Sequence, residues 1–382
     1  MILQWCKWAF STLLACLLFL TVLLIVTPQG RTGIRTALFL PQILPGFPVK
    51  PQEWFTSPPT RERISFPIAS GKGKADIYQP SSPGKHSAIL LFLGVNPAGS
   101  EDPRVVGLAE GLARSGVVVM IPWSDNMTQR RVSVDEIDNL VNAFQYMIGL
   151  ENVDPQHSGV GGFCVGASFT MVAAQDHRIR DQVKFVNFFG GYYNAKDLIT
   201  SVVSSTRFDT THQQSWTPDA LSTEVVGIHL IEGLHDSGER SLLKQIFIKQ
   251  NASSDSKIIA SLSPKAKIVY ELLMGPTLDE AKSLIETLPS TTIETLQAIS
   301  PASNINNLKA RPLIMHDRAD SLVPSEESKR LARALSTNNE AYYTEFSLFD
   351  HVDPTRTVSL PIYLKELWKL YLHMYNVLRE LS

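Results

Sequence analysis

One five-residue string in this sequence combines a reactive side chain with small residues on both sides of it. Gly162-Phe163-Cys164-Val165-Gly166 has a cysteine at its centre and a glycine two positions away in each direction. A nucleophile elbow needs this pattern, because the sharp turn from a strand into a helix brings backbone close to the nucleophile on both sides. Cysteine is strongly nucleophilic near neutral pH, and a helix N-terminus or a neighbouring histidine favours its thiolate. The string predicts that Cys164 attacks an acyl carbon; a buried, unreactive cysteine in a glycine-rich turn is the alternative.

Two later segments offer the acid and the base that such a nucleophile requires. After an elbow, the acid and the histidine are expected in that order, each just past the end of a strand. Asp320 follows the apolar segment at Pro312–Met315, and His351 follows a strand-like segment at Tyr342–Leu348. Asp317 competes for the acid's place because it lies nearer to the strand end. We favour Asp320, since the loop after it turns into a helix and leaves that carboxylate at the rim.

These side chains can meet only if the segments before them are neighbouring strands of one sheet. Continuous apolar runs of strand length are typical of strands buried on both faces of a parallel sheet, and helical periodicity separates them here. The expected strands are Ala88–Leu93, Val117–Ile121, Ser158–Phe163, Lys184–Phe189, Pro312–Met315 and Tyr342–Leu348, after a hairpin of Arg63–Pro67 and Lys74–Gln79. The expected helices are Pro103–Ser115, Ser133–Ile148 with a capping box at Ser133 and Glu136, Val165–Asp176, Ser325–Leu335 and Leu360–Glu380.

The alternation stops over residues 196–295, which is too long a stretch for a structureless loop in a compact domain. Three segments there have helical periodicity, and Val225–Ile231 is a strand-like run. We predict a mainly helical cap, inserted into an α/β domain made of residues 61–195 and 296–382. The α/β domain is expected to be doubly wound around a mostly parallel sheet.

With these residues in view, the sequence resembles the alpha/beta-hydrolase superfamily, and its cysteine elbow is similar to that of the dienelactone hydrolase family. The resemblance covers residues 87–194 and 298–375. It implies a triad of Cys164 as nucleophile, His351 as base and Asp320 as the acid that orients the base. It also implies an oxyanion hole formed by the backbone N–H groups of Val95 and Val165.

Composition and charge exclude several other classes of protein. Lys and Arg number 35 and Asp and Glu 37, so the formal charge of −2 lacks the basic footprint of a nucleic-acid binder. Outside the N-terminal run only Cys164 remains, which excludes a disulfide framework and paired-cysteine zinc sites in that part. The string Gly161–Ser168 lacks the lysine of a phosphate-binding loop. We predict no metal and no cofactor.

An apolar N-terminal run predicts a membrane association. Residues 8–26 carry no charge over a length that can cross a hydrocarbon core of about 30 Å. We expect residues 1–35 to form a single-pass anchor in the lipid bilayer; a cleaved signal peptide is the alternative. Basic residues flank the run on both sides, so they leave its orientation open. Residues 36–60, rich in proline, are expected to be an extended linker whose apolar residues pack on the domain; contact of the linker with the bilayer surface is the alternative.

The sequence thus predicts a membrane-anchored hydrolase that cleaves a small-molecule ester or lactone through an acyl-thioenzyme. The alternative is a hydrolase-fold protein that binds a ligand or partner without turnover. Arg104, Arg130 and Arg131 are candidates to bind a substrate carboxylate. The sequence specifies neither the natural substrate nor the oligomeric state.

Overall fold

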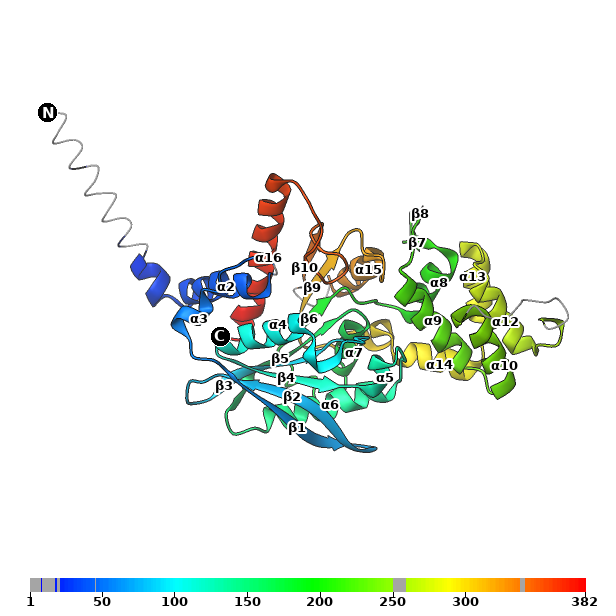
Figure 1. The fold of residues 1–382 in the computed structure, drawn as a ribbon, viewed down its shortest axis with the longest axis horizontal. Helices are drawn as coiled ribbons and strands as arrows, with labels where there is room; N and C mark the ends of the chain where they lie inside the picture. The colour runs from blue at the N-terminus through cyan, green and yellow to red at the C-terminus, as the bar shows by residue number, and fades with distance from the viewer. Residues whose placement is uncertain (1–7, 9–17, 19–20, 45, 250–258, 337–340) are drawn as a thin grey trace.

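The computed structural model describes residues 8, 18, 21–44, 46–249, 259–336 and 341–382. Eight strands form one sheet in the order β1-β2-β4-β3-β5-β6-β9-β10 (Figure 1). Strand β1 runs antiparallel to β2, and β2 runs antiparallel to β4. All other neighbours in the sheet are parallel. The strands are β1 Thr60–Ile68, β2 Gly71–Gln79, β3 His86–Phe92, β4 Val117–Trp123, β5 Val153–Phe163, β6 Phe185–Phe189, β9 Arg311–Asp317 and β10 Tyr342–Phe346. The mostly parallel sheet is therefore confirmed.

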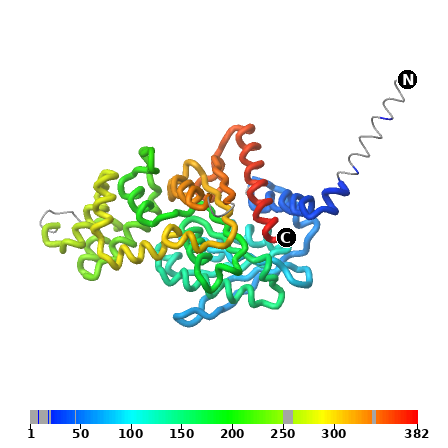
Figure 2. The backbone as a smooth tube through the Cα atoms, turned by 180° about the vertical axis from the view of Figure 1, so that it is seen from behind, coloured from blue at the N-terminus to red at the C-terminus, as the bar shows by residue number. Residues whose placement is uncertain are grey.

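Helices cover both faces of the sheet (Figures 1 and 2). The first face carries α2 Pro28–Ile43, α4 Pro103–Arg114 and α16 Leu360–Glu380, and the second α6 Asp135–Ile148, α7 Val165–Ala173 and α15 Ser325–Leu335. Strand β9 illustrates the alternation, because Leu313 and Met315 pack into the core of the first face and Ile314 into that of the second. Short helical turns complete this part: η1 Gly99–Glu101, α3 Gln52–Phe55, α5 Asp125–Thr128 and η3 Pro301–Asn307.

The segment between β6 and β9 is mainly helical and extends the molecule to one side (Figure 1). It contains α8 Ala195–Ser204, α9 Ala220–Glu232, α10 Ser237–Leu243, the π-helical turn η2 Lys244–Ile248, α12 Pro264–Leu273, α13 Leu278–Glu286, α14 Ser290–Ala298 and a small hairpin of β7 Thr206–Phe208 and β8 Gln213–Ser215. The strand expected at Val225–Ile231 is wrong, since these residues lie within α9. Two ion pairs, Arg130–Glu224 at 2.7 Å and Arg131–Glu232 at 3.1 Å, tie this helix to the loop before α6.

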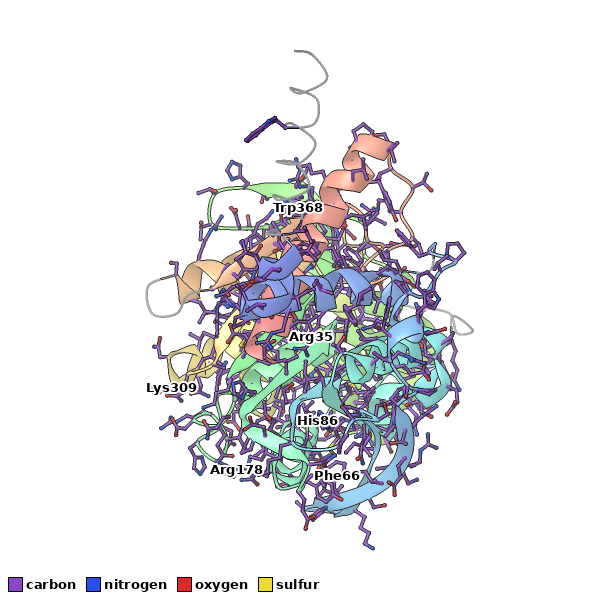
Figure 3. The ribbon with its side chains drawn as sticks, turned by 90° about the vertical axis from the view of Figure 1, so that its left-hand side faces the viewer. Arg35, Phe66, His86, Arg178, Lys309 and Trp368 are labelled. Carbon is purple, nitrogen blue, oxygen red and sulfur yellow. The ribbon has the colours of Figure 1, made fainter. Side chains whose placement is uncertain are left out.

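The proline-rich segment packs on the domain as expected, but its first part is helical rather than extended. Helix α2 continues to Ile43 with Pro41 inside it, and Phe39 is fully buried against the first face of the sheet. Arg35, labelled in Figure 3, donates to the carbonyl oxygen of Ser115 and to the hydroxyl of Ser382. Proline is tolerated near the end of α2 because packing on the domain offsets the lost hydrogen bond.

The predicted membrane helix lies largely outside the described residues, because residues 9–17 and 19–20 are not among them. Within the part that the structure describes, no helix combines the length and the apolarity needed to cross a membrane.

Candidate active site

Cys164 stands alone between the end of β5 and the start of α7. Its backbone has φ 54° and ψ −139°, a conformation that non-glycine residues rarely adopt. Its N–H donates to the carbonyl oxygen of Phe189 in β6, at 2.9 Å. Strain of this kind persists only where the surroundings hold it, and it is common at functional sites. The expected strand-to-helix elbow is therefore present.

The two elbow glycines have no room for a side chain. A Cβ atom on Gly162 would lie 2.5 Å from the backbone of Ala167. A Cβ on Gly166 would lie 2.4 Å from the backbone nitrogen of Gly94, whose own φ is +69°. The turn after β3 thus packs directly against the elbow, and this contact requires glycine on both sides of it.

His351 and Asp320 come together across two loops of the sheet edge. Nδ1 of His351 lies 2.6 Å from Oδ2 of Asp320, and both side chains are buried. The other carboxylate oxygen accepts the backbone N–H groups of Leu322 and Val323 at 2.7 and 3.1 Å. Nε2 of His351 is buried and has no hydrogen-bond partner among the described residues. The imidazole is therefore held by one nitrogen while the other remains available.

Asp317, the competing carboxylate, has different partners. It accepts the N–H groups of Ala319 and Phe349, each at 2.9 Å, and lies 3.2 Å from the guanidinium of Arg356. Burial raises its pKa. Because Phe349 precedes His351 by two residues, Asp317 fixes the histidine loop rather than the imidazole itself.

Electrostatics in the pair favour an imidazolium next to a carboxylate. Burial alone would lower the pKa of His351, but its interactions with Asp320 and, next, with Cys164 outweigh burial and raise that pKa well above its ordinary value. Burial alone would raise the pKa of Asp320, yet His351 and His316 hold it well below its usual range. The backbone also connects the two residues: Cys164 bonds to Phe189, and a Cβ atom on the next residue, Gly190, would lie 3.2 Å from Cε1 of His351.

Two neighbours of Asp320 were missed by sequence reasoning. His316 is fully buried in β9, with Nε2 3.2 Å from Oδ2 of Asp320 and Nδ1 2.6 Å from the hydroxyl of Ser328. Trp216 of the cap donates its indole N–H to the carbonyl oxygen of Asp320 at 2.9 Å. The one signal in the sequence was the position of His316, which directly precedes Asp317 at the end of a strand. A polar residue buried at such a position needs a hydrogen-bond partner nearby.

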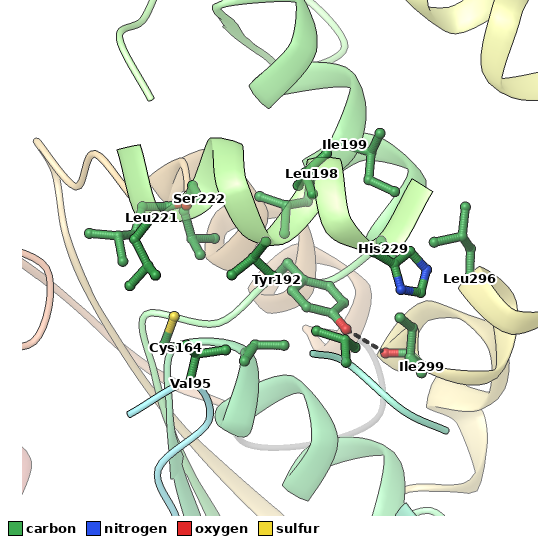
Figure 4. A pocket seen from close by; sticks show the side chains of 17 residues that line it. Val95, Cys164, Tyr192, Leu198, Ile199, Leu221, Ser222, His229, Leu296 and Ile299 are labelled. Atoms are coloured by element: carbon green, nitrogen blue, oxygen red, sulfur yellow. Dashed lines mark hydrogen bonds between the residues drawn. The ribbon is translucent and has the colours of Figure 1, made fainter. Parts of the chain in front are cut away.

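The residues expected to form the oxyanion hole both lie beside Cys164. Val95 follows the Gly94 turn, and Val165 is the first residue of α7. The N–H of a first-turn residue has no acceptor within its own helix, so it can serve a ligand. Val95 and Val165 line the same cavity as Cys164 (Figure 4).

That cavity lies between the elbow and the cap and has an empty volume of about 620 Å³, including its part open to solvent. Its lining is almost wholly aliphatic, with residues from the body and from α8, α9 and α14. Figure 4 shows Cys164 at one end and His229 at the other, with Tyr192 between them. The hydroxyl of Tyr192 donates to the carbonyl oxygen of Ile299 at 3.1 Å, and burial lowers the pKa of His229. The cavity therefore offers an apolar surface with little charge.

None of the three candidate arginines lines this cavity. Arg104 pairs with Asp102 and Asp353, and the other two pair with carboxylates of α9 as described above. The described residues also contain no group of three or more His, Cys, Asp or Glu side chains suited to a metal ion.

Comparisons with known proteins identify the fold. No family model matches the chain, and no curated protein sequence matches it. Among solved structures, the acylaminoacyl peptidase of Pyrococcus horikoshii matches with a TM-score of 0.51 and 13% identity over 84% of this chain. This chain has the alpha/beta-hydrolase fold.

Two further structures complete the comparison. An acylaminoacyl peptidase in complex with Z-Gly-Gly-Phe-chloromethyl ketone matches with a TM-score of 0.51 and 13% identity over 85% of this chain. The two peptidase structures are much longer, and the match covers 42% of each. A hyperthermophilic esterase from Pyrobaculum calidifontis matches with a TM-score of 0.47 and 12% identity, over 92% of this chain and 91% of the esterase.

Proposed function

We propose that this protein is a membrane-anchored hydrolase that cleaves carboxylic esters or lactones with an apolar acyl part, through a covalent intermediate on Cys164. One observation carries the proposal: an elbow cysteine opens onto an apolar cavity beside a histidine that is hydrogen-bonded at 2.6 Å to a buried aspartate. A structural cysteine has no need of the strained backbone, the histidine or the cavity. The similarity of the elbow to that of the dienelactone hydrolase family supports the same chemistry.

Acylation begins with Cys164 and His351. The sulfur attacks the ester carbonyl carbon, and the carbonyl oxygen becomes an oxyanion that the N–H groups of Val95 and Val165 stabilise. His351 holds the thiol proton as an imidazolium next to Asp320 and gives it to the departing alkoxide. The C–O bond breaks, the alcohol leaves and a thioester remains on Cys164.

Deacylation uses the same groups in reverse. His351, now neutral, removes a proton from a water molecule whose oxygen attacks the thioester carbon. The oxyanion forms again, the C–S bond breaks, and the proton returns to sulfur as the carboxylic acid leaves. Asp320 stays ionised throughout, which agrees with a pKa held well below its usual range.

The substrate class follows from the cavity. Its aliphatic lining suits an acyl chain or an alkyl ring that extends from Cys164 toward His229. All three candidate arginines are engaged elsewhere, so a substrate carboxylate has no evident partner among them. We therefore propose a different substrate from the small carboxylated lactone implied by the dienelactone hydrolase resemblance.

Turnover of a panel of 4-nitrophenyl esters from acetate to decanoate, by wild type and Cys164→Ala, tests the proposed chemistry. We expect a preference for chains longer than acetate and loss of turnover in the folded variant. Full activity in Cys164→Ala would refute it. Ligand binding without any turnover would favour the non-catalytic alternative, and cleavage of amides in preference to esters would favour a peptidase, as in the fold relatives from Pyrococcus horikoshii.

Membrane anchoring through residues 8–26 is tested separately. Full-length protein reconstituted in vesicles should stay with the lipid after washing with alkaline carbonate, which removes peripheral proteins. Release of intact protein would argue against the anchor, and release after N-terminal shortening would indicate a cleaved signal.

A further inference from the structure

The last helix carries an apolar stripe that is only partly covered. Leu360, Leu364, Trp368, Tyr371 and Tyr375 follow each other at spacings of four, four, three and four residues, which places them along one face of α16. The three N-terminal members are exposed, with 60% of Trp368 accessible. The opposite face packs on the sheet. Exposed apolar residues in a continuous row indicate a surface that another body covers.

The C-terminal part of the same stripe is half-buried and faces the N-terminal segment across a groove. Trp368 stacks on Tyr371 at a centroid distance of 5.3 Å and 12° between the rings, and Tyr371 contacts Tyr375 at 6.5 Å. The two tyrosines form one wall of a groove whose other wall includes Leu23 and Leu24. Trp368, Tyr371 and Tyr375 thus connect the exposed part of α16 with Leu23 and Leu24 of the N-terminal segment.

A short turn fixes how this N-terminal segment meets the domain. The hydroxyl of Thr27 donates to the carbonyl oxygen of Leu23 at 2.7 Å and accepts the N–H of Gly30 at 3.1 Å, so it caps α2. The hydroxyl of Tyr371 donates to the carbonyl oxygen of Gly33 at 3.3 Å. The described apolar residues 22–26, all exposed, are therefore held next to α16.

Charge along the exposed part of α16 suits a lipid surface. Within Leu360–Lys369, all of which the structure describes, the one acidic side chain, Glu366, is buried and paired with Lys369. Lys365 is exposed. A lysine can extend its ammonium to lipid phosphates while apolar neighbours enter the interface, where tryptophan and tyrosine are also preferred.

We propose that the N-terminal half of α16, with Leu360, Leu364 and Trp368, lies in the interfacial layer of a lipid bilayer and orients the domain on it. Figure 3 shows Trp368 on the part of α16 that projects from the domain body. The inference rests on the proposed membrane anchor, because residues 8–26 would bring the bilayer next to this helix.

Tryptophan quenching in vesicles tests the contact with the full-length chain. The vesicles contain phosphatidylcholine and phosphatidylglycerol with bromine atoms on shallow acyl carbons. We expect wild type to lose more emission to bromine than Trp368→Phe, which keeps a ring to stack on Tyr371. Trp123→Phe, in the sheet, serves as the matched control and should leave the quenchable emission unchanged. Equal quenching of wild type and Trp368→Phe would overturn the proposal.

Two further measurements separate this surface from the other proposals. Leu364→Lys should reduce the quenching of Trp368, whereas Met274→Lys, at a cap residue that is 59% exposed, should not.

A blue-shifted Trp368 emission that bromine does not quench would instead indicate a second copy on this face and would overturn the bilayer contact. Carbonate washing reports on the anchor and ester turnover in detergent on the chemistry, so each can fail independently of the quenching difference.

Discussion

Exchanging each of the two buried carboxylates for an amide should separate their roles. Asp320→Asn removes the negative charge whose oxygen lies 2.6 Å from Nδ1 of His351, while its remaining oxygen can still accept the N–H groups of Leu322 and Val323. Asp317→Asn is the matched control, since it is equally buried but contacts the N–H of Phe349 and the guanidinium of Arg356. Only the first exchange changes a group in contact with the imidazole.

The expected losses differ by at least an order of magnitude. At an effective dielectric constant of about 20, two charges roughly 4 Å apart interact by about 4 kcal/mol, which corresponds to about 10³ in rate. The amide also favours the wrong imidazole tautomer, and the same exchange in comparable triads lowers kcat by about 10⁴. We expect a loss of roughly 10³ to 10⁴ in Asp320→Asn. A shift of the histidine loop in Asp317→Asn should cost about tenfold, and no more than about 10².

The assay is kcat/KM on one 4-nitrophenyl ester for wild type and both variants. Urea unfolding and circular dichroism establish that each variant is folded, because each exchange also disturbs buried hydrogen bonds worth about 1–3 kcal/mol. Equal losses in the two folded variants, or a greater loss in Asp317→Asn, would refute the assignment and make Asp317 the acid.

Three other outcomes are expected. Folded Cys164→Ser should have strongly reduced ester turnover, because a hydroxyl depends fully on His351 for deprotonation; native-like kcat/KM would contradict this. Leu198→Trp, in the cavity wall, should lower kcat/KM for decanoate at least about tenfold while sparing acetate, since it fills the space for the chain; parallel losses would argue against this binding mode. The contribution of the Asp320–His351 pair to the free energy of unfolding should be greatest between pH 3.8 and pH 6.5, which are the ordinary pKa values of the two groups. The reason is that folding lowers the pKa of Asp320 and raises the pKa of His351. It should shrink as pH falls through the folded pKa of Asp320 or rises through that of His351, and a pH-independent difference between wild type and Asp320→Asn in urea unfolding would contradict the coupling.

Local patterns determined much of the sheet and several helices. The bounds of Ser325–Leu335 and Leu360–Glu380 agree with those of α15 and α16, because a clear helical period and flanking prolines mark them in the sequence. The Gly-Phe-Cys-Val-Gly string located the elbow, since the close backbone contacts there exclude every larger residue at Gly162 and Gly166. Both signals are short-range, so they can be read from the sequence alone.

Patterns failed where a tertiary contact overrode a local preference. The run Val225–Ile231 resembles a strand, but it lies on α9, where its apolar residues cover the cavity and the cap core. The capping box at Ser133 and Glu136 is wrong as well: α6 begins at Asp135 without a side-chain cap, and Glu136 bonds to Ser124 instead. Side-chain partners far along the chain decided both cases.

The sequence by itself determined the elbow, the alternating strands and helices, and the pool of candidate acids and bases. The sequence favoured Asp320 over Asp317, but only the tertiary structure shows the bond between Asp320 and His351. It alone also decided that His316 and Trp216 contact Asp320, and that α8, α9 and α14 enclose an apolar cavity above Cys164. The physical reason is the range of the interactions. Strand and helix periods and glycine sterics act between near neighbours, whereas hydrogen bonds and cavities depend on where segments far apart in the sequence meet.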